Sequence, residues 1–331
     1  MDVDAFVAVN APQWERLERL LGQRRLTGTQ SDELVSLYQS TATHLSQIRS
    51  AAPDPTVVSR LSTLLARARG TIAGAHEPAW SDVVRFVVIS LPAAFYRVRW
   101  WTLAMMALFL LVGVSSGWWT ATHPEVLATL GTPNERRLYA EQAFEAYYSN
   151  NPAPDFAAQV WTNNAWIAAR AIGLGITGYF PLQIIVANAQ GVGQAAAMMH
   201  EFGQLDLFFA LILPHGLMEL TAIFISAGAG LKIFWAWVSP GPRTRSRALA
   251  EEGRALFTVA IGLVAVLAVS GMVEGFVTPS SLPTGVKITI GALVLAAYWV
   301  YSIGLGRIAV RDGETGDVRA EHAEDTVAMA G

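Results

Sequence analysis

Apolar and polar residues divide the chain into three regions. Residues 1–97 carry frequent charges and short amphipathic runs, residues 98–306 consist mainly of long apolar stretches, and residues 307–331 are polar and rich in Asp, Glu, Gly and Ala. Long apolar stretches are typical of membrane spans, whereas a polar terminal segment of this composition is typical of disorder. We therefore expect an N-terminal helical domain, a transmembrane domain and a disordered cytoplasmic tail.

The N-terminal region has the spacing of amphipathic helices. Near its start, apolar residues line one helix face at Trp14, Leu17, Leu20 and Leu21. Further runs of this kind lie within 31–48 and 57–70. The pattern predicts a small helical bundle without a binding site of its own. Its basic residues Arg60, Arg67 and Arg69 face either solvent or anionic lipid headgroups, and the sequence leaves both interpretations open.

The clearest span covers residues 100–119. A pair of tryptophans stands at each end of it, and the pairs are separated by about 18 residues, which is roughly 27 Å of helix and close to the thickness of a hydrocarbon core. Because Arg85, Arg97 and Arg99 precede this span, the positive-inside rule places the N-terminal region in the cytoplasm. Charge and proline interrupt the apolar segment 83–99, which favours a membrane-surface helix leading into the span.

The remaining apolar stretches predict five further spans after one polar segment. Residues 120–163 are acidic, include an expected helix at 135–148 and should lie outside the cell. Spans are then expected at 164–188, 190–213, 215–238, 255–275 and 286–306. Basic residues before the fifth span and after the last one place both positions in the cytoplasm. This requires an even number of spans, and about six satisfies it.

The stretch 164–214 is the least regular part of the transmembrane region. It is rich in Gly and Pro, and no Lys or Arg lies between Arg170 and Lys232, so the positive-inside rule gives no information there. Broken or re-entrant helices fit this composition and would leave five or six spans. The expected fold is all-α, a polytopic membrane helical bundle with an N-terminal cytoplasmic helical domain.

Composition excludes several classes of protein. The chain is 53% apolar and only 15% charged, and its net charge of -3 offers no electrostatic surface for phosphate groups, so we expect no nucleic-acid partner. The absence of cysteine excludes a disulfide framework, a thiolate metal site and a Cys nucleophile. The sequence also lacks zinc-protease, nucleophile-elbow and P-loop motifs. We therefore expect no enzyme activity, no catalytic residue and no cofactor.

Ionisable residues inside the spans are candidates for function because charge is costly there. His215 and Glu219 stand four positions apart and would share one helix face. As a metal pair they are one ligand short of a catalytic zinc site, unless His200 and Glu201 complete the set. As an acid–base pair they lack a nucleophile. We favour a structural hydrogen bond that holds a helix start while Glu219 reaches a neighbouring helix, and we expect no metal.

Two other features favour a tightly packed bundle. An arginine in lipid needs a carboxylate partner, so we expect Arg170 to pair with Glu219 or Glu274. Glycines within 173–178 and 228–230 predict that helix backbones approach one another closely there.

Several of these residues resemble the signature of the stage II sporulation protein M family of membrane proteins. The string LPHGLMELTAIFISAGAGL at 213–231 carries the most specific part of the resemblance, a Pro-His-Gly-x-x-Glu motif. The positions that we take as family-motif and intramembrane polar candidates are Asn163, Asn164, Arg170, Gln190, Gly191, Pro214, His215, Gly216, Glu219, Glu274 and Pro279. Gln190 stands where the family pattern leads us to expect Asn. The Ala-, Arg- and Val-rich composition is typical of an actinobacterial member.

The resemblance implies a function by recruitment rather than by catalysis. In endospore-forming bacteria, the founding member is associated with anchoring peptidoglycan-degrading partners at the membrane. We therefore expect a multi-pass protein of the cell membrane, with cytoplasmic N- and C-termini, that acts as a scaffold for cell-envelope or peptidoglycan-remodelling proteins. The lipid bilayer and, as an open alternative, further copies of the chain are the other expected partners. The competing hypothesis is a transporter or lipid-active membrane protein that uses Arg170, His215, Glu219 and Glu274.

Overall fold

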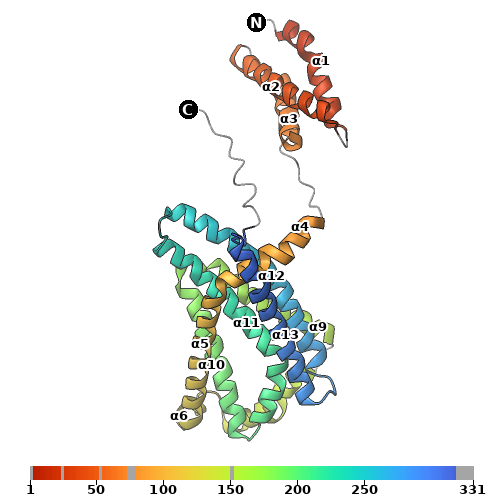
Figure 1. The fold of residues 1–331 in the computed structure, drawn as a ribbon. Helices are drawn as coiled ribbons and strands as arrows, with labels where there is room; N and C mark the ends of the chain where they lie inside the picture. Colours follow the sequence, from red (N-terminus) through yellow and green to blue (C-terminus); the bar gives the residue numbers. More distant parts are fainter. Residues whose placement is uncertain (1–2, 24–25, 52–53, 73–79, 150–152, 318–331) are drawn as a thin grey trace. The chain divides into compact units, whose positions relative to one another are not determined.

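The computed structural model describes residues 3–23, 26–51, 54–72, 80–149 and 153–317. The chain divides into two compact units, the small unit Met1–Ser81 and the large unit Asp82–Gly331 (Figure 1). The described residues form helices joined by short turns and contain no strand. The expected all-α fold is therefore confirmed.

The small unit is built from helices α1 (Val3–Leu21), α2 (Gly28–Ala51) and α3 (Pro55–Ile72). Their apolar faces enclose one core in which Trp14 and Leu17 are fully buried. The indole Nε1 of Trp14 donates a 3.2 Å hydrogen bond to Nδ1 of His44 on α2. Asp54 caps the start of α3, because its carboxylate accepts a 2.7 Å hydrogen bond from the backbone N–H of Thr56. This packing confirms the helical bundle that the apolar spacing predicts.

The large unit contains the remaining helices. In chain order they are α4 (Trp80–Arg85), η1 (Phe86–Ser90), α5 (Leu91–Thr122), α6 (Pro124–Ala128), α7 (Pro133–Leu138), η2 (Tyr139–Ala143), α8 (Phe144–Ser149), α9 (Ala153–Gly173), η3 (Gly175–Thr177), α10 (Tyr179–Glu201), α11 (Leu205–Val238), α12 (Arg245–Met272), η4 (Val273–Val277) and α13 (Thr284–Arg311).

The helical run that contains the first expected span begins well before residue 100, where the sequence placed the start of the span. The segment 83–99 is continuous with the span, because α4, η1 and α5 form one helical run. The π-helical turn η1 ends at Ser90, two residues before Pro92, whose missing N–H cannot take part in the regular helical hydrogen bonding. The run belongs to the large unit from Asp82 onward, whereas the sequence placed the domain boundary after residue 97.

Four helices among the described residues are long and apolar enough to cross a membrane. They cover Asp82–Thr122, Leu205–Val238, Arg245–Val277 and Thr284–Arg311. The expected count of six membrane spans is not confirmed, because α9 and α10 are not apolar enough, by mean hydropathy, to be counted as membrane-spanning helices.

The span boundaries expected at 164, 188–190 and 213–215 are wrong, whereas the expected end at 238 coincides with the end of α11. Instead of continuous spans at 164–188 and 190–213, the chain breaks just after α9 and again after α10. Gly178 and Gly203 stand at these breaks with φ of 69° and 73°, a left-handed conformation that glycine adopts without strain. Pro214, which the sequence placed at a span boundary, lies inside α11.

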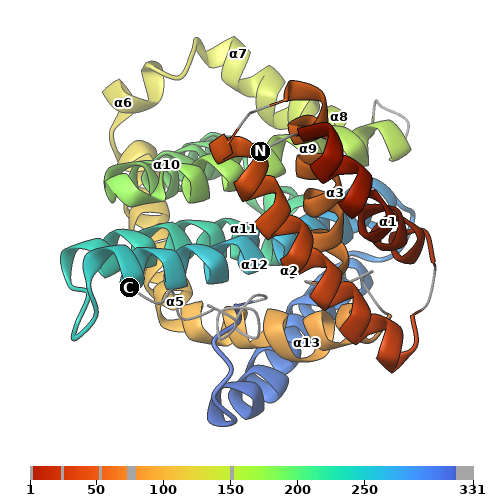
Figure 2. The same ribbon diagram turned by 90° about the horizontal axis from the view of Figure 1, so that it is seen from above.

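Helix α11 lies at the centre of the large unit. It packs against α5, α9, α10, α12 and α13, and it runs beside α12 (Figures 1 and 2). Every residue from 221 to 231 is buried. A Cβ added at Gly230 would lie 2.4 Å from the carbonyl oxygen of Ala171 on α9, so the two backbones are in contact there. This contact confirms the close approach that the glycine pattern predicts.

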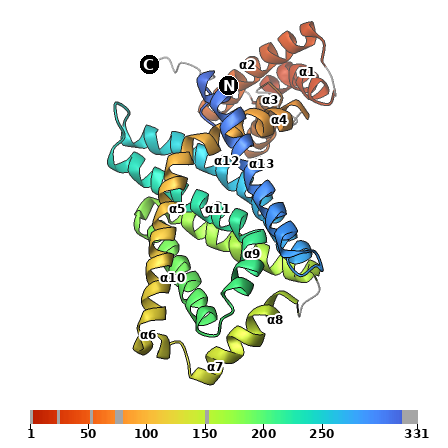
Figure 3. The ribbon, with the colours of Figure 1, turned by 60° about the horizontal axis from the view of Figure 1, so that its bottom comes forward.

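Short helices cross one end of the large unit. Figure 3 shows α6, α7 and α8 running from the end of α5 to the start of α9. The expected helix at 135–148 is present as α7, η2 and α8. Thr132 and Glu135 form a capping box at its start, and the hydrogen bonds from Thr132 hold the pKa of Glu135 below its ordinary value.

The segment after α13 is partly ordered, contrary to the expected disorder from residue 307. Helix α13 continues to Arg311, and the next residues pack against α12. The hydroxyl of Thr258 donates a 2.7 Å hydrogen bond to the carbonyl oxygen of Gly316, and Arg254 pairs with Asp317. The part of the expected tail from 318 to 331 lies outside the described residues.

Candidate functional site

Three ionisable side chains meet inside the large unit. His215 and Glu219 come from α11, and Glu274 comes from η4. One ligand-type atom from each lies within 4.8 Å of the other two. The imidazole Nε2 of His215 is 3.7 Å from Oε1 of Glu274. We refer to these residues as the His–Glu cluster.

The local fold explains how Glu274 reaches the other two residues. Helix α12 widens into the π-helical turn η4, and the N–H of Thr278 bonds to the carbonyl oxygen of Val273, five residues earlier, at 3.0 Å. A π turn rotates the residues that follow it relative to a regular helix. On the other side, His215 and Glu219 are one helical turn apart and therefore face the same way.

A second layer of polar groups holds the cluster. Nδ1 of His215 is 3.1 Å from the hydroxyl of Thr278, and the amide of Asn164 on α9 donates a 2.7 Å hydrogen bond to Oε1 of Glu219. The hydroxyl of Ser270 donates to the backbone carbonyl of His215 at 3.1 Å. The bonds from Thr278 and Asn164 each hold one polar atom of a cluster side chain, whereas the bond from Ser270 holds the backbone at His215.

The cluster is buried and incompletely satisfied. His215 is 5% exposed and Glu274 is 3% exposed. The Oε2 atoms of Glu219 and Glu274 are buried and have no hydrogen-bond partner. Burying a carboxylate without a partner is expensive, so the arrangement requires a cation or a proton between the two acids.

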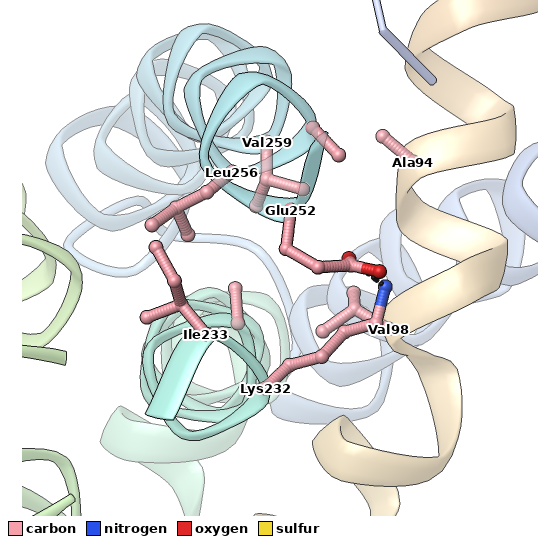
Figure 4. A pocket seen from close by; sticks show the side chains of 9 residues that line it. Ala94, Val98, Lys232, Ile233, Glu252, Leu256 and Val259 are labelled. Carbon is pink, nitrogen blue, oxygen red and sulfur yellow. Dashed lines mark hydrogen bonds and ion pairs between the residues drawn. The ribbon is translucent and has the colours of Figure 1, made fainter. Parts of the chain in front are cut away.

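A second polar group lies at the end of the large unit where α5 and α12 begin. Glu252 accepts hydrogen bonds from Lys232 at 2.6 Å and from Arg97 at 2.9 Å. Figure 4 shows Lys232 and Glu252 meeting beside Ala94 and Val98 of α5. The residues joined by these bonds come from α5, α11 and α12, so the ends of these helices lie together.

We refer to the end of the large unit that contains Arg97, Lys232 and Glu252 as the charged end. Further ion pairs lie beside these three residues. Glu251 bonds to both Arg243 and Arg247, at 2.6 and 2.8 Å. Glu251 and Glu252 lie in the first turns of α12 and join α12 to the end of α11 and the loop that follows it.

The opposite end has one strong ion pair. Arg136 in α7 binds Glu201 at the end of α10 through two hydrogen bonds of 2.8 and 2.9 Å, and it also donates to the carbonyl oxygen of Gly131. This arginine is 7% exposed. The pair anchors the segment that contains α6, α7 and α8 to α10.

The structure brings together four of the sequence candidates and separates the others. Asn164, His215, Glu219 and Glu274 form the site and its second layer. Pro214 and Gly216 are buried next to His215 on α11. The remaining candidates are exposed, and they are Asn163, Arg170, Gln190, Gly191 and Pro279.

Two interpretations of these residues are corrected. Arg170 was expected to pair with Glu219 or Glu274, but it is exposed, and Glu219 bonds to Asn164 instead. His200 and Glu201 were considered as residues that could complete a metal site with His215 and Glu219, but Glu201 pairs with Arg136 and the third cluster residue is Glu274. The expectation that Glu219 reaches a neighbouring helix is confirmed, although His215 lies within α11 rather than at a helix start.

Sequence reasoning missed Thr278, Ser270 and Tyr148 as neighbours of the cluster. The ring of Tyr148 in α8 lies 5.6 Å from the imidazole of His215, measured between centroids. Pro279, one of the candidates from the family resemblance, directly follows Thr278, so the sequence held one signal for this position. Nothing in the local sequence around Tyr148 connects it with α11.

Two known protein families match separate parts of the chain. The family model of Stage II sporulation protein M matches residues 106–279, which is more than half of the chain. The chain belongs to this family. A second model, a domain of unknown function designated DUF8413, matches residues 4–74. Neither a curated protein nor a solved structure matches the chain.

The stage II sporulation protein M match contains the whole His–Glu cluster together with Asn164 and Thr278. The match begins within α5 and ends at Pro279, so α13 and the small unit lie outside it. The DUF8413 match covers α1, α2 and α3. Together with the four apolar helices, the family assignment indicates a membrane protein.

Proposed function

We propose that this stage II sporulation protein M chain is a scaffold in the cell membrane that recruits cell-envelope or peptidoglycan-remodelling proteins. The observation that carries the proposal is the amount of folded chain outside the apolar helices. The small unit has its own core and its own family match, and the α6–α8 segment is held by the Arg136–Glu201 pair. These two parts supply protein surfaces for partners.

The orientation of the large unit supports the same proposal. Arg97, Arg243, Arg247 and Arg254 gather at the charged end, which under the positive-inside rule faces the cytoplasm. The contact between Arg254 and Asp317 brings the end of the described chain to this same side. The small unit and the C-terminus would then be cytoplasmic, while the α6–α8 segment would face the outside, where peptidoglycan lies.

The alternative, transport or lipid handling, has one observation in its favour, which is the buried and unpartnered carboxylate oxygens of Glu219 and Glu274. Other observations favour the scaffold. A cavity of about 370 Å³ beside α13 is lined by apolar residues such as Leu91, Phe95 and Met218 and does not include the cluster. Arg170, which the transport hypothesis needs, is exposed, whereas the carboxylate oxygens of the cluster are buried.

Site-specific photocrosslinking in living cells tests the scaffold. A photoreactive residue is placed at Leu138 or Tyr147, which are 51% and 53% exposed on α7 and α8. Leu111, which is 67% exposed within the α5 span, is the matched control. We expect Leu138 and Tyr147 to capture a peptidoglycan-binding or peptidoglycan-cleaving protein that Leu111 does not capture. Recovery of no envelope protein above this control, together with unchanged cell shape after deletion of the chain, would refute the proposal.

A further inference from the structure

We propose that His215, Glu219 and Glu274 bind one divalent transition-metal ion, such as Zn²⁺, inside the large unit. The proposal is independent of the scaffold function. It rests on three observations: the convergence of three ligand-type atoms, the two unpartnered carboxylate oxygens, and the orientation of His215 and Glu219 by outer hydrogen bonds.

The three side chains offer a suitable donor set. One imidazole nitrogen and two carboxylates are common ligands of Zn²⁺ in proteins. Bond lengths of about 2.0–2.2 Å in a tetrahedral site separate neighbouring ligand atoms by roughly 3.4 Å. Nε2 of His215 and Oε1 of Glu274 are 3.7 Å apart, and the widest separation within the cluster stays below 4.8 Å. Rotation about the terminal torsion of Glu274, whose carboxylate no outer hydrogen bond from a described residue holds, would bring its oxygens closer to the other two ligand atoms.

The hydrogen bond between Nδ1 of His215 and Thr278 leaves Nε2, the ring nitrogen that faces Glu274, free to bind a metal ion. The hydroxyl of Thr278 lies 3.5 Å from the carbonyl oxygen of Val273 and 3.1 Å from Nδ1 of His215, so it can donate to Val273 and accept an N–H from Nδ1. The neutral imidazole then has its lone pair at Nε2, which faces Glu274. Metal-binding histidines are commonly held in this way by a partner on the other ring nitrogen.

Asn164 performs the same task for Glu219. Its amide donates to Oε1 at 2.7 Å and so fixes the carboxylate plane, while Oε2 is left without a hydrogen-bond partner. Oε2 of Glu274 is likewise unpartnered. Among the described residues, no Lys or Arg forms an ion pair with either glutamate; their one such contact is that of Glu274 with His215.

A divalent cation explains these features together. Three lone-pair donors face one another in a buried site, and without positive charge their mutual repulsion and their desolvation both oppose folding. A proton shared between the two glutamates would relieve the carboxylates but would leave Nε2 of His215 without a partner. A metal ion satisfies all three and links α11 to η4, with α9 attached through Asn164.

Metal analysis of the full chain in detergent tests the proposal. The protein is stripped with a chelator, incubated with Zn²⁺ or with Co²⁺ and freed of unbound metal by gel filtration. We expect about one equivalent of zinc per chain, a ligand-field absorption for the cobalt form and a higher Tm with either metal. His215→Gln, Glu219→Gln and Glu274→Gln should each lower the retained metal at least tenfold.

Matched controls come from the exposed residues His200 and Glu141. His200→Gln and Glu141→Gln remove the same side-chain types and should retain the metal of the unmodified protein. Failure of the unmodified chain to bind stoichiometric zinc overturns the proposal, whether or not the variants fold. Equal metal content in the cluster variants and the controls also overturns it, because it shows binding elsewhere on the chain.

Discussion

Asn164 of α9 donates a 2.7 Å hydrogen bond to Oε1 of Glu219 on α11, and both side chains lie in the interior of the large unit. The bond joins two helices at the point where the chain buries its acidic side chains. It also distinguishes Asn164 from its neighbour Asn163, which is exposed although both belong to the family pattern. The two asparagines therefore provide a matched pair for experiment.

Replacing Asn164 with Ala should destabilise the protein by about 1–3 kcal/mol, because a buried acceptor loses its donor. Asn163→Ala should change the stability by less than about 0.5 kcal/mol, as expected for an exposed position. Thermal unfolding in detergent, followed by tryptophan fluorescence, measures both. Equal effects of the two substitutions would show that the bond to Glu219 does not contribute to folding.

The contact between α11 and α9 leaves no room for a methyl group at Gly230. Gly230→Ala places a Cβ 2.4 Å from the carbonyl oxygen of Ala171, so we expect a loss of about 1–3 kcal/mol from overpacking. Gly304→Ala in α13 has no atom within 4 Å of the added Cβ and should be neutral or stabilising by up to about 1 kcal/mol. Denaturant unfolding of both variants compares them. A neutral Gly230→Ala would mean that the helices separate easily.

Glu252 should matter more than the adjacent glutamate. It is 7% exposed and binds both Arg97 and Lys232, so Glu252→Gln leaves two partly buried cations without their carboxylate and should cost about 1–3 kcal/mol. Glu251 forms more exposed pairs, and Glu251→Gln should cost less than about 1 kcal/mol. Measurements of Tm at low and high salt compare the Glu252→Gln variant with the Glu251→Gln variant. The reverse order of effects would contradict the role assigned to Glu252.

A fall in pH should lower the stability of the small unit, because it protonates His44 in the unfolded chain before it does so in the folded unit. Burial lowers the pKa of His44 below its ordinary value of about 6.5, so between the two values the unfolded chain binds a proton that the folded unit excludes. The stabilisation is present above about pH 6.5 and is lost as the pH falls, by at most about 1.4 kcal/mol per pH unit. Hydrogen exchange of α1–α3 amides in the full chain, corrected for intrinsic rates, measures the change.

His44→Gln should remove this dependence between pH 7 and 5. The hydrogen bond from Arg16 lowers the pKa of Glu33, so that pair loses its effect only below the ordinary Glu value of about 4.3 and does not interfere. Identical pH profiles for the variant and the unmodified protein would assign the effect to another group.

Several features could be predicted because they depend on local pattern. The apolar run between the tryptophan pairs lies within α5, and the spacing of Trp14 and Leu17 marks the face of α1 that is buried. The reach of Glu219 to another helix followed from the cost of a charge in an apolar stretch. The close packing at Gly230 followed from small residues at helical spacing.

Other features could not be predicted because they depend on tertiary contacts. Glu274 joins His215 through a π-helical turn, and a shift of this kind leaves no recognisable pattern in the sequence. Pro214 continues α11 although proline usually ends a helix, and its carbonyl lies against the backbone of Gly291 on α13. Arg97 and Glu252 are 155 positions apart and meet only when α5 and α12 pack together.

The orientation of the large unit is the most direct test of the scaffold, because recruitment of envelope proteins needs the α6–α8 segment outside. The chain has no native cysteine, so single thiols can be introduced without background. Glu141→Cys lies in η2, and Ser246→Cys lies at the charged end. In intact cells a membrane-impermeant thiol reagent should label the position-141 variant and spare the position-246 variant until the membrane is opened. Labelling of position 246 alone in intact cells would contradict the account.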